Sequence, residues 1–319
     1  MNPIIQTLKQ YQNFLITSHV NPDGDSLGSE IALAMALKKM NKEVVVLGKE
    51  GIPGLYKFLP GVDLIKNQEY ISDYKSYVAI ILDCGDIKRI QADIDKVRDS
   101  ILIINIDHHF SNNYYGDQNL VCPEASATAE IIYELIEEVN SKLFDKDIAT
   151  NLYVGIFTDT GSFRYANTTP KSLFITSKLL AYDVKPDIVA TQIHETVSYG
   201  RLKLLGKALH NLEVSSDGRK AWMVINKKMA QQTNHSLLDT EEFVNYPRSI
   251  RGIEVAILFR EEVKGYKVSL RSKGKLNVAN VALKFNGGGH NNAAGCTIEA
   301  DLEKVKTDIF KALDEEGMK

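Results

Sequence analysis

The sequence lacks the features of a membrane or secreted protein. The chain of 319 residues contains no run of 18 apolar residues, whereas a membrane-spanning helix needs about 20. Its first residues, MNPIIQTLKQYQNF, do not show the basic and then apolar layout of a secretion signal. We therefore expect a cytoplasmic protein with no membrane partner. The length predicts two domains.

Cysteine is scarce. The three cysteines, Cys84, Cys122 and Cys296, lie far apart and form no C-x-x-C pair. This spacing predicts neither a disulfide framework nor a zinc knot, and it favours a reducing compartment. We interpret Cys84 as a small buried residue and assign it no chemistry.

Aromatic residues are also few, at 8% of the chain. No basic stretch is interleaved with aromatic side chains, which is the pattern of proteins that bind long single strands of nucleic acid. Tyr114, Tyr115, Phe163 and Tyr165 could stack on a base. Packing in the core or at its rim explains these four better.

The net charge of −3 hides an uneven distribution. Residues 201–290 contain 16 Lys and Arg against 8 Asp and Glu, a net charge of +8. Because the whole chain has 38 basic and 41 acidic residues, 22 basic and 33 acidic residues remain elsewhere, a net charge of −11. A cation-binding part joined to an anion-binding part would produce this pattern, and so would chance clustering of surface charge.

The first half of the chain alternates β-branched runs with segments of helical periodicity. This alternation predicts an α/β domain over residues 1–185, with a parallel sheet that has helices on both faces. The predicted strands are 14–19, 43–47, 77–83 and 101–107, and the predicted helices are 26–40, 125–139, 147–159 and 169–182.

The pattern changes after a segment that is helical except for Pro186. We interpret residues 186–211 as a helical linker. Residues 212–319 predict a smaller α+β domain, because strand patterns come first and helical patterns follow. These strands are predicted at 221–226, 252–261 and 266–273, and these helices at 277–286 and 301–316.

Aspartates and histidines stand at the ends of apolar segments in the first domain. In an open parallel sheet, ligands bind just beyond the carboxyl ends of the strands. A single aspartate there is more often a cap or turn residue, but four segments repeat the feature. They contribute His19, Asp23 and Asp25 in a loop after the first strand, Asp83 with Asp86 nearby, Asp107, His108 and His109, and Asp159. The repetition predicts a metal site.

The candidate ligands are carboxylates and imidazoles, without a cysteine thiolate. This set suits Mn²⁺ or a similar octahedral divalent ion better than structural zinc. The set is too large for one ion, and two ions that share a carboxylate would use all of it. Two neighbouring ions are the recurring machinery of phosphoester hydrolysis, because they activate water and offset charge on the phosphoryl oxygens.

At this point the motifs resemble a known family. HVNPDGDSLGS, LDCGD, DHH and FTDTGSFRY are similar, in this order, to the four motifs of the DHH phosphoesterases. The later segment RSKGKLNVANVALKFNGGGHNNAAGCTI resembles the companion DHHA1 domain. The resemblance covers essentially the whole chain. Within the family, the compact two-domain layout is most similar to the nanoRNase and pAp phosphatase type.

The resemblance implies a role for each motif residue. The residues that would hold two Mn²⁺ ions, with Mg²⁺ or Co²⁺ as substitutes, are His19 and Asp23 for the first, Asp25, His108 and Asp159 for the second, and Asp83 for both. His109 would stand beside the scissile phosphate as a hydrogen-bond donor or general acid. Asp107 would orient an imidazole.

Three consecutive glycines precede a histidine in the basic domain. Glycine lets a backbone approach a phosphate and present N–H groups to it, and a flexible turn that happens to contain a histidine explains these residues equally well. The resemblance favours phosphate binding by Gly287, Gly288, Gly289, His290 and Arg271. Arg164 is a further candidate contact, for which a surface ion pair is an equal alternative. The first domain would cut a substrate while the second holds one of its phosphates, which favours short oligonucleotides.

The resemblance also implies a substrate class. We expect a Mn²⁺-dependent hydrolase of RNA two to five nucleotides long that also converts 3′-phosphoadenosine 5′-phosphate (pAp) to AMP. Its partners would be short single-stranded RNA and nucleotides, and the sequence leaves a homodimer open. A cyclic di-AMP or pApA phosphodiesterase and a single-strand-specific DNA exonuclease are alternatives with the same chemistry. A non-catalytic nucleotide sensor is disfavoured, because every motif position keeps its ligand.

Chelation should abolish phosphoester hydrolysis, and Mn²⁺ should restore it better than Zn²⁺. The reason is that the ligand set is rich in carboxylate oxygen and has no thiolate. The measurement is the initial rate after treatment with EDTA, removal of the chelator and addition of each ion. A preference for Zn²⁺ would contradict the interpretation of the ligand set.

Overall fold

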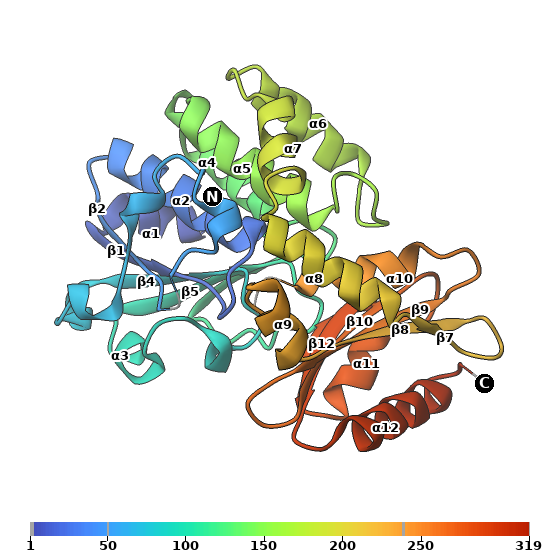
Figure 1. Cartoon of the computed structure of the whole chain (residues 1–319). Coiled ribbons are helices and arrows are strands. Elements are labelled where there is room, and N and C mark those ends of the chain that lie inside the picture. Colours follow the sequence, from blue (N-terminus) through green and yellow to red (C-terminus); the bar gives the residue numbers. More distant parts are fainter. Residues whose placement is uncertain (1–2, 50, 238–239, 319) are drawn as a thin grey trace. The chain divides into compact units, whose positions relative to one another are not determined.

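The structure, a computed structural model, describes residues 3–49, 51–237 and 240–318. The chain divides into two compact units (Figure 1), the first ending at Thr196 and the second beginning at Val197. The segment 186–211 contains two helices, α7 (Pro186–His194) and α8 (Tyr199–His210), and the division falls between them. In the described ranges, no helix has the length and apolar character needed to cross a membrane.

The first unit is built on a six-stranded sheet in the order β3-β2-β1-β4-β5-β6, in which all neighbouring strands are parallel. Its strands are β1 (Asn13–Thr17), β2 (Glu43–Leu47), β3 (Ile65–Lys66), β4 (Val78–Leu82), β5 (Leu102–Asp107) and β6 (Gln118–Val121). The four predicted strands are present. The strand order reverses between β1 and β4, so their carboxyl ends flank the crevice where such sheets bind ligands.

The central strands are buried on both faces. In β4, Val78, Ile80 and Leu82 belong to one core, whereas Ala79 and Ile81 belong to another. This separation follows from the pleat, which turns successive side chains to opposite faces. Runs of Val, Ile and Leu without polar alternation are therefore what such strands require.

Among the helices that the structure describes, the longer ones cover one of these two faces. They are α1 (Pro3–Gln10), α2 (Gly24–Lys39), α4 (Thr128–Asn140), α5 (Lys146–Asp159), α6 (Pro170–Leu180) and α7, all of which contribute side chains to the first core. The second core is closed by the short helix α3 (Ile94–Arg98) and by 3-10 turns that contribute Tyr74 and Ile87. The prediction of an α/β sheet flanked by helices is confirmed, but one face has mostly short turns.

Helices α2 and α5 approach each other closely at two glycines. A Cβ atom on Gly28 would lie 2.4 Å from the backbone oxygen of Asn151. A Cβ atom on Gly155 would lie 2.6 Å from Cβ of Ala129 and 3.0 Å from Oδ1 of Asp25. Side chains at these positions would force the helices apart. The glycines thus set the spacing between the start of α2 and the end of α5.

The second unit contains a mixed sheet in the order β11-β12-β10-β9-β8-β7, in which only β8 and β9 pair in parallel among the described strands. Its strands are β7 (Glu213–Val214), β8 (Lys220–Ile225), β9 (Val255–Glu261), β10 (Tyr266–Ser272), β11 (Gly288–His290) and β12 (Ala293–Ile298). One face packs against α11 (Val278–Leu283) and α12 (Leu302–Glu315), and the other against α8. The short helices α9 (Lys227–Thr233) and α10 (Asn245–Ser249) complete this α+β unit.

Replacement of Gly28 by alanine should destabilise the first unit by about 1–3 kcal/mol, because the added methyl group meets the backbone of α5. A matched control is Gly206→Ala in α8, where an added Cβ has no described atom within 4 Å. Higher helix propensity should make that control neutral or stabilising by up to about 1 kcal/mol. Urea denaturation followed by circular dichroism measures both. An unchanged midpoint for Gly28→Ala would show that the helix contact is looser than described.

Candidate metal centre

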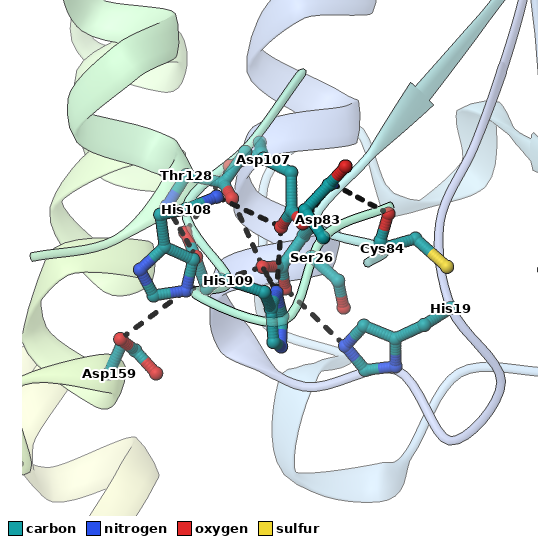
Figure 2. A network of polar contacts seen from close by, with 12 residues as sticks. His19, Ser26, Asp83, Cys84, Asp107, His108, His109, Thr128 and Asp159 are labelled. Atoms are coloured by element: carbon teal, nitrogen blue, oxygen red, sulfur yellow. Dashed lines mark hydrogen bonds and ion pairs between the residues drawn. The ribbon is translucent and has the colours of Figure 1, made fainter. Parts of the chain in front are cut away.

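Three adjacent strands bring the predicted histidines and aspartates to one edge of the sheet. His19 follows β1 by two residues, Asp83 directly follows β4, and Asp107 is the last residue of β5. Because these strands lie side by side and parallel, their carboxyl ends meet at one edge. Figure 2 shows the imidazoles of His19, His108 and His109 around Asp83.

The beginning of α2 supplies two more aspartates. Asp23 is the N-cap residue, and its Oδ1 accepts hydrogen bonds from the backbone N–H groups of Asp25 and Ser26. Asp25 lies in the first turn of the helix rather than in the loop that we expected. The helix starts earlier than predicted because an N-cap aspartate satisfies the first free N–H groups.

The fourth segment ends a helix and not a strand. Asp159 is the last residue of α5. Its Oδ2 lies 3.8 Å from Nε2 of His108 and accepts a hydrogen bond of 3.2 Å from the side-chain amide of Asn167. Asp159 therefore joins the group at the sheet edge from the side of the helical layer.

Asp83 lies at the centre of the group. It is 2% exposed, and its backbone is left-handed, with φ of 53°. Its Oδ2 lies 3.4 Å from Nε2 of His19, and its Oδ1 lies 3.5 Å from Nε2 of His108 and 3.6 Å from Nδ1 of His109. The hydroxyl group of Thr128 donates a hydrogen bond of 3.0 Å to the same Oδ1. One carboxylate thus contacts all three imidazoles.

Three groups of possible metal ligands contain this carboxylate. The first consists of His19, Asp23 and Asp83, the second of Asp25, Asp83 and His108, and the third of Asp83, Asp107 and His109. Within each group the ligand atoms lie within 4.8 Å of one another. The resemblance implies two metal positions that contain the first two of these groups, and it adds Asp159 to the second.

Two of the imidazoles turn the same nitrogen toward the carboxylates. Nδ1 of His19 lies 2.8 Å from the carbonyl oxygen of Val20, and Nδ1 of His108 lies 3.3 Å from that of Ala125. A carbonyl oxygen only accepts hydrogen bonds, so each Nδ1 carries the proton. Nε2 of each ring therefore faces the carboxylates, and it becomes a metal ligand when a cation displaces its proton.

The imidazole of His109 is held differently. Its Nδ1 lies 2.7 Å from Oδ1 of Asp107, a residue that is fully buried. The other oxygen of Asp107 accepts a hydrogen bond of 2.6 Å from the side-chain amide of Asn112. Both oxygens of Asp107 are therefore engaged, and one of them fixes the orientation of the His109 ring.

A buried network of hydrogen bonds continues from Asp107 away from His109. Asn112 also donates to Oδ1 of Asn105, and Asn105 donates to the hydroxyl group of Tyr115. Tyr115 in turn donates to the carbonyl oxygen of Cys84 at 2.9 Å. These hydrogen bonds anchor Tyr115 in the loop after β5. Tyr115 also packs against the second core, which agrees with its interpretation as a packing residue. The network was not predicted, although a polar Asn105 inside an apolar strand is a signal that could have indicated it.

Glu30 is another buried group that the sequence analysis did not single out. It lies in α2 and is 1% exposed. Burial raises the pKa of its carboxyl group to about 8, although a hydrogen bond with Ser18 and the charge of His19 act in the opposite direction. A single glutamate in the apolar segment EIALAMAL was the available signal.

Arg164 lies near the end of α5. Its side chain is exposed, and its Nε donates a hydrogen bond of 2.7 Å to the carbonyl oxygen of Gly161. The three residues before it, 161–163, all have positive φ angles between 57° and 63°. Among the contacts described for it, the guanidinium has no carboxylate partner, so the alternative of a surface ion pair finds no support.

The predicted phosphate-binding residues of the second unit lie on neighbouring strands. In the sheet register, Arg271 of β10 and His290 of β11 both stand opposite Ala293 of β12. Directly opposite residues share a face of the sheet, so the guanidinium group of Arg271 and the imidazole of His290 lie on one face.

The glycines of this loop are required by close packing. A Cβ atom on Gly287 would lie 2.2 Å from the backbone oxygen of Gly295, and one on Gly289 would lie 2.4 Å from that of Ala293. Gly289 also has φ of 141°. The third glycine, Gly288, begins β11 and pairs with Gly295. Backbone packing alone thus explains two of the three glycines.

Two family models match the chain. The model of the DHH family, N-terminal domain, matches residues 13–156, and the model of the DHHA1 domain matches residues 223–317. The chain belongs to the DHH family. The resemblance inferred from the four motifs and the glycine-rich segment is therefore confirmed.

Full-length relatives carry one recurring name. The bifunctional oligoribonuclease and PAP phosphatase NrnA of Thermus thermophilus is 32% identical over 99% of this chain and 94% of its own length. The protein of the same name from Bacillus subtilis is 30% identical over 96% of both chains. The crystal structure of an exopolyphosphatase-related protein from Bacteroides fragilis has a TM-score of 0.91 and 31% identity, and covers 98% of this chain and 95% of its own. This DHH protein is a phosphoric ester hydrolase.

The imidazoles and carboxylates of the candidate metal centre lie close enough to shift each other's pKa values. Burial lowers the pKa of His19, but the hydrogen bond with Asp83 and the charge of Asp23 outweigh it and raise the pKa to about 10. Burial also lowers the pKa of His108, and the surrounding carboxylates, led by Asp159, raise it to about 9. Burial and the charge of Asp83 raise the pKa of Asp25 well above its usual range.

These residues fit divalent cations in chemistry and spacing. Ligands about 2.1 Å from an octahedral ion lie roughly 3 Å from their neighbours and about 4.2 Å from the opposite ligand. The Nε2 atoms of His19 and His108 lie 3.4–3.9 Å from the carboxylate oxygens around them. A cation would also relieve the repulsion between buried carboxylates. The group is therefore a candidate acidic and histidine-containing metal site.

The protein stripped of divalent ions should lose stability as the pH rises from 6.5 to 8.5. His19 and His108 have pKa values of about 10 and 9 in the folded chain against 6.5 as the ordinary value. In this window the folded state binds more protons than the unfolded state, so the free energy of unfolding falls with increasing pH. Thermal unfolding at the two pH values measures the effect.

The same measurement with Mn²⁺ provides the control. A bound cation requires neutral imidazoles, so it should remove most of this pH dependence. A melting temperature of the stripped protein that rises between pH 6.5 and 8.5 would contradict the proximity of imidazoles and carboxylates.

Proposed function

We propose that the chain is a Mn²⁺-dependent hydrolase of RNA two to five nucleotides long, which it degrades to mononucleotides, and that it also converts pAp to AMP. The names of the full-length relatives support this substrate class. The observation that carries the proposal is the position of Asp83, which belongs to a ligand group with His19 and Asp23 and to another with Asp25 and His108, as a carboxylate shared by two ions would.

The proposed ligands form two positions. The first position consists of His19, Asp23 and Asp83, and the second position consists of Asp25, Asp83, His108 and Asp159. When bound there, two divalent cations would supply a water of lowered pKa and positive charge opposite the phosphoryl oxygens. The short Nδ1 contacts of His19 and His108 would keep both Nε2 atoms available as ligands.

In the proposed reaction, His109 acts on the leaving group. Its Nδ1–H group donates to the buried Asp107 carboxylate, which holds the ring in one orientation. Nε2 can then give its proton to the ribose oxygen as the bond between that oxygen and phosphorus breaks. A water molecule gives one proton to solvent, and its oxygen forms the new bond to phosphorus on the side opposite the leaving oxygen. Burial raises the pKa of Asp107, but the hydrogen bond with His109 and, to a lesser extent, that with Asn112 outweigh it and lower the pKa, so Asp107 itself stays ionised.

The basic residues would bind phosphates that are not cleaved. Arg271 and His290 share a face of the second sheet and could donate to one phosphate together. Gly287, Gly288 and Gly289 lie beside His290 and would permit close approach of the backbone. Arg164, which follows α5, would contact the phosphate being cleaved or its neighbour.

Replacement of Asp83 by asparagine should lower kcat by at least about 1,000-fold, or about 4 kcal/mol, because one proposed ligand of both cations loses its charge. Asparagine tolerates the left-handed backbone at this position, so the fold should persist. The matched control is Asp86→Asn, which changes an aspartate just beyond the same strand that accepts a hydrogen bond from the backbone of Lys88. Near-normal turnover of Asp83→Asn would contradict the bridging role.

A panel of substrates tests the proposed specificity. The purified protein with Mn²⁺ is given pAp, dinucleotide RNA, five-nucleotide RNA, pApA, cyclic di-AMP and a twenty-nucleotide single-stranded DNA, and kcat/KM is compared. Highest values for the short RNAs and clear turnover of pAp are expected. A preference for cyclic di-AMP or for the long DNA would overturn the proposal.

The same panel tests the phosphate contact at Arg271. Arg271→Ala should raise KM for dinucleotide RNA about 10- to 100-fold, because a charge-assisted hydrogen bond is lost. Mn²⁺ binding should not change. Lys264→Ala, at an exposed lysine near the other end of β10, serves as the control. Loss of Mn²⁺ binding in Arg271→Ala would contradict its assignment to substrate.

A further inference from the structure

The segment Ala125–Ala129 belongs to none of the predicted site motifs, yet it reaches every ligand of the second position. The carbonyl oxygen of Ala125 lies 3.3 Å from Nδ1 of His108. The backbone N–H groups of Thr128 and Ala129 donate to Oδ2 and Oδ1 of Asp25 at 2.6 Å and 2.8 Å. The hydroxyl group of Thr128 contacts Asp83. The side-chain amide of Asn167 connects Ser126 with Asp159.

The contact with Asp83 comes from a side chain. The hydroxyl group of Thr128 donates a hydrogen bond of 3.0 Å to Oδ1 of Asp83, and both residues are buried. The same residue thus contacts two aspartates, Asp25 through its N–H group and Asp83 through its hydroxyl group. Figure 2 shows Thr128 beside Asp83 and His108.

The contact with Asp159 passes through Asn167. The side-chain amide of Asn167 donates to the carbonyl oxygen of Ser126 at 2.9 Å. It also donates to the backbone oxygen of Asp159 at 3.1 Å and to its Oδ2 at 3.2 Å. Asn167 therefore ties the end of α5 to the segment that begins α4.

The start of α4 explains why Asp25 takes part. The N-cap residue is Ala127, whose side chain cannot accept a hydrogen bond, and the helix has no side-chain cap of its own. The first free N–H groups of a helix need an acceptor. Asp25, which is 103 residues away from Thr128 in the chain, supplies both carboxylate oxygens.

The segment is also fixed from its other side. The buried carboxylate of Glu130 accepts hydrogen bonds from the N–H group of Ser126 at 3.1 Å and from its hydroxyl group at 2.7 Å. Lys171 of α6 lies 3.1 Å from the other oxygen of Glu130. A segment held in this way has little freedom to move when a cation binds.

We propose that Ala125–Ala129 is the positioning segment of the second position and that Thr128 is its principal positioning residue. This inference rests on the proposed function. Its hydroxyl and N–H groups orient the carboxylates of Asp83 and Asp25 before any cation binds. Residues that orient ligands in this way typically contribute about 10- to 100-fold to metal affinity.

Isothermal titration of the chelator-treated protein with Mn²⁺ tests the inference. Wild-type protein should bind two ions. Thr128→Val, which keeps the shape but removes the hydroxyl group, should weaken one of the two binding events by about 10- to 100-fold. Thr128→Ser, which restores the hydroxyl group, should bind within about threefold of wild type. The melting temperature of each variant is measured without Mn²⁺.

Thr176→Val is the matched control. Thr176 is a buried threonine of α6, and its hydroxyl group donates to the carbonyl oxygen of Ser172 in the same helix. Its replacement removes a buried hydroxyl group of the same unit without touching the proposed ligands, so Mn²⁺ binding should not change. Equal weakening by Thr176→Val would show that the effect is a general loss of stability and would overturn the inference.

A second variant keeps the test decisive if Thr128→Val does not fold. Asn167→Ala removes the amide that joins Ser126 to Asp159, at a residue that is only half-buried, and should weaken the same binding event about tenfold. Two tight binding events in the folded valine variant, or in Asn167→Ala if that variant alone folds, would overturn the inference and leave the proposed function intact. Wild-type protein that binds no Mn²⁺ would overturn the proposed function itself.

Discussion

The candidate centre depends on the burial of one carboxylate, that of Asp83, among three imidazoles. β4 lies between β1 and β5 in the sheet, so the residue that follows it is within reach of histidines that follow both neighbours. The left-handed backbone of Asp83 ends the strand at this point. A carboxylate that is 2% exposed must be paired, because an isolated buried charge is very costly. The histidines at the sheet edge and the rest of the centre follow from that requirement.

The other carboxylates create an electrostatic problem that side chains of the protein solve only in part. Asp25 and Asp159 have raised pKa values because burial and like charge both disfavour ionisation, and the pKa of Asp159 is about 6. Helix termini, hydroxyl groups and imidazoles offset some of this cost. A cation would offset the remainder, so its binding free energy would add to the stability of the native fold. The arrangement is therefore ready for an ion and strained without one.

Much of this organisation could be predicted from sequence, and the limits have physical reasons. β-branched runs predict β1, β2, β4 and β5, but the edge strand β6, with the sequence QNLV, has no such run. The motif residues at the strand ends could be identified because each stands at the end of an apolar segment that is visible in the local sequence. The roles of Thr128 and Asn112 could not be predicted, since these residues act through hydrogen bonds with partners that only the fold brings close. The prediction that Asp25 lies in a loop was wrong, because Asp23 caps α2 and the helix therefore begins before Asp25.

The glycine contact between α2 and α5 has a consequence for ion selectivity. Asp25 stands at the start of one helix and Asp159 at the end of the other, and Gly28 and Gly155 let the two backbones touch. The distance between the two helix axes thus sets the width of the gap that a cation would fill between these carboxylates. Ions that differ in radius demand cavities of different size. In the proposed metal site, a methyl group added between these helices would therefore change the selection among Mn²⁺, Mg²⁺ and larger ions, while every proposed ligand would remain the same.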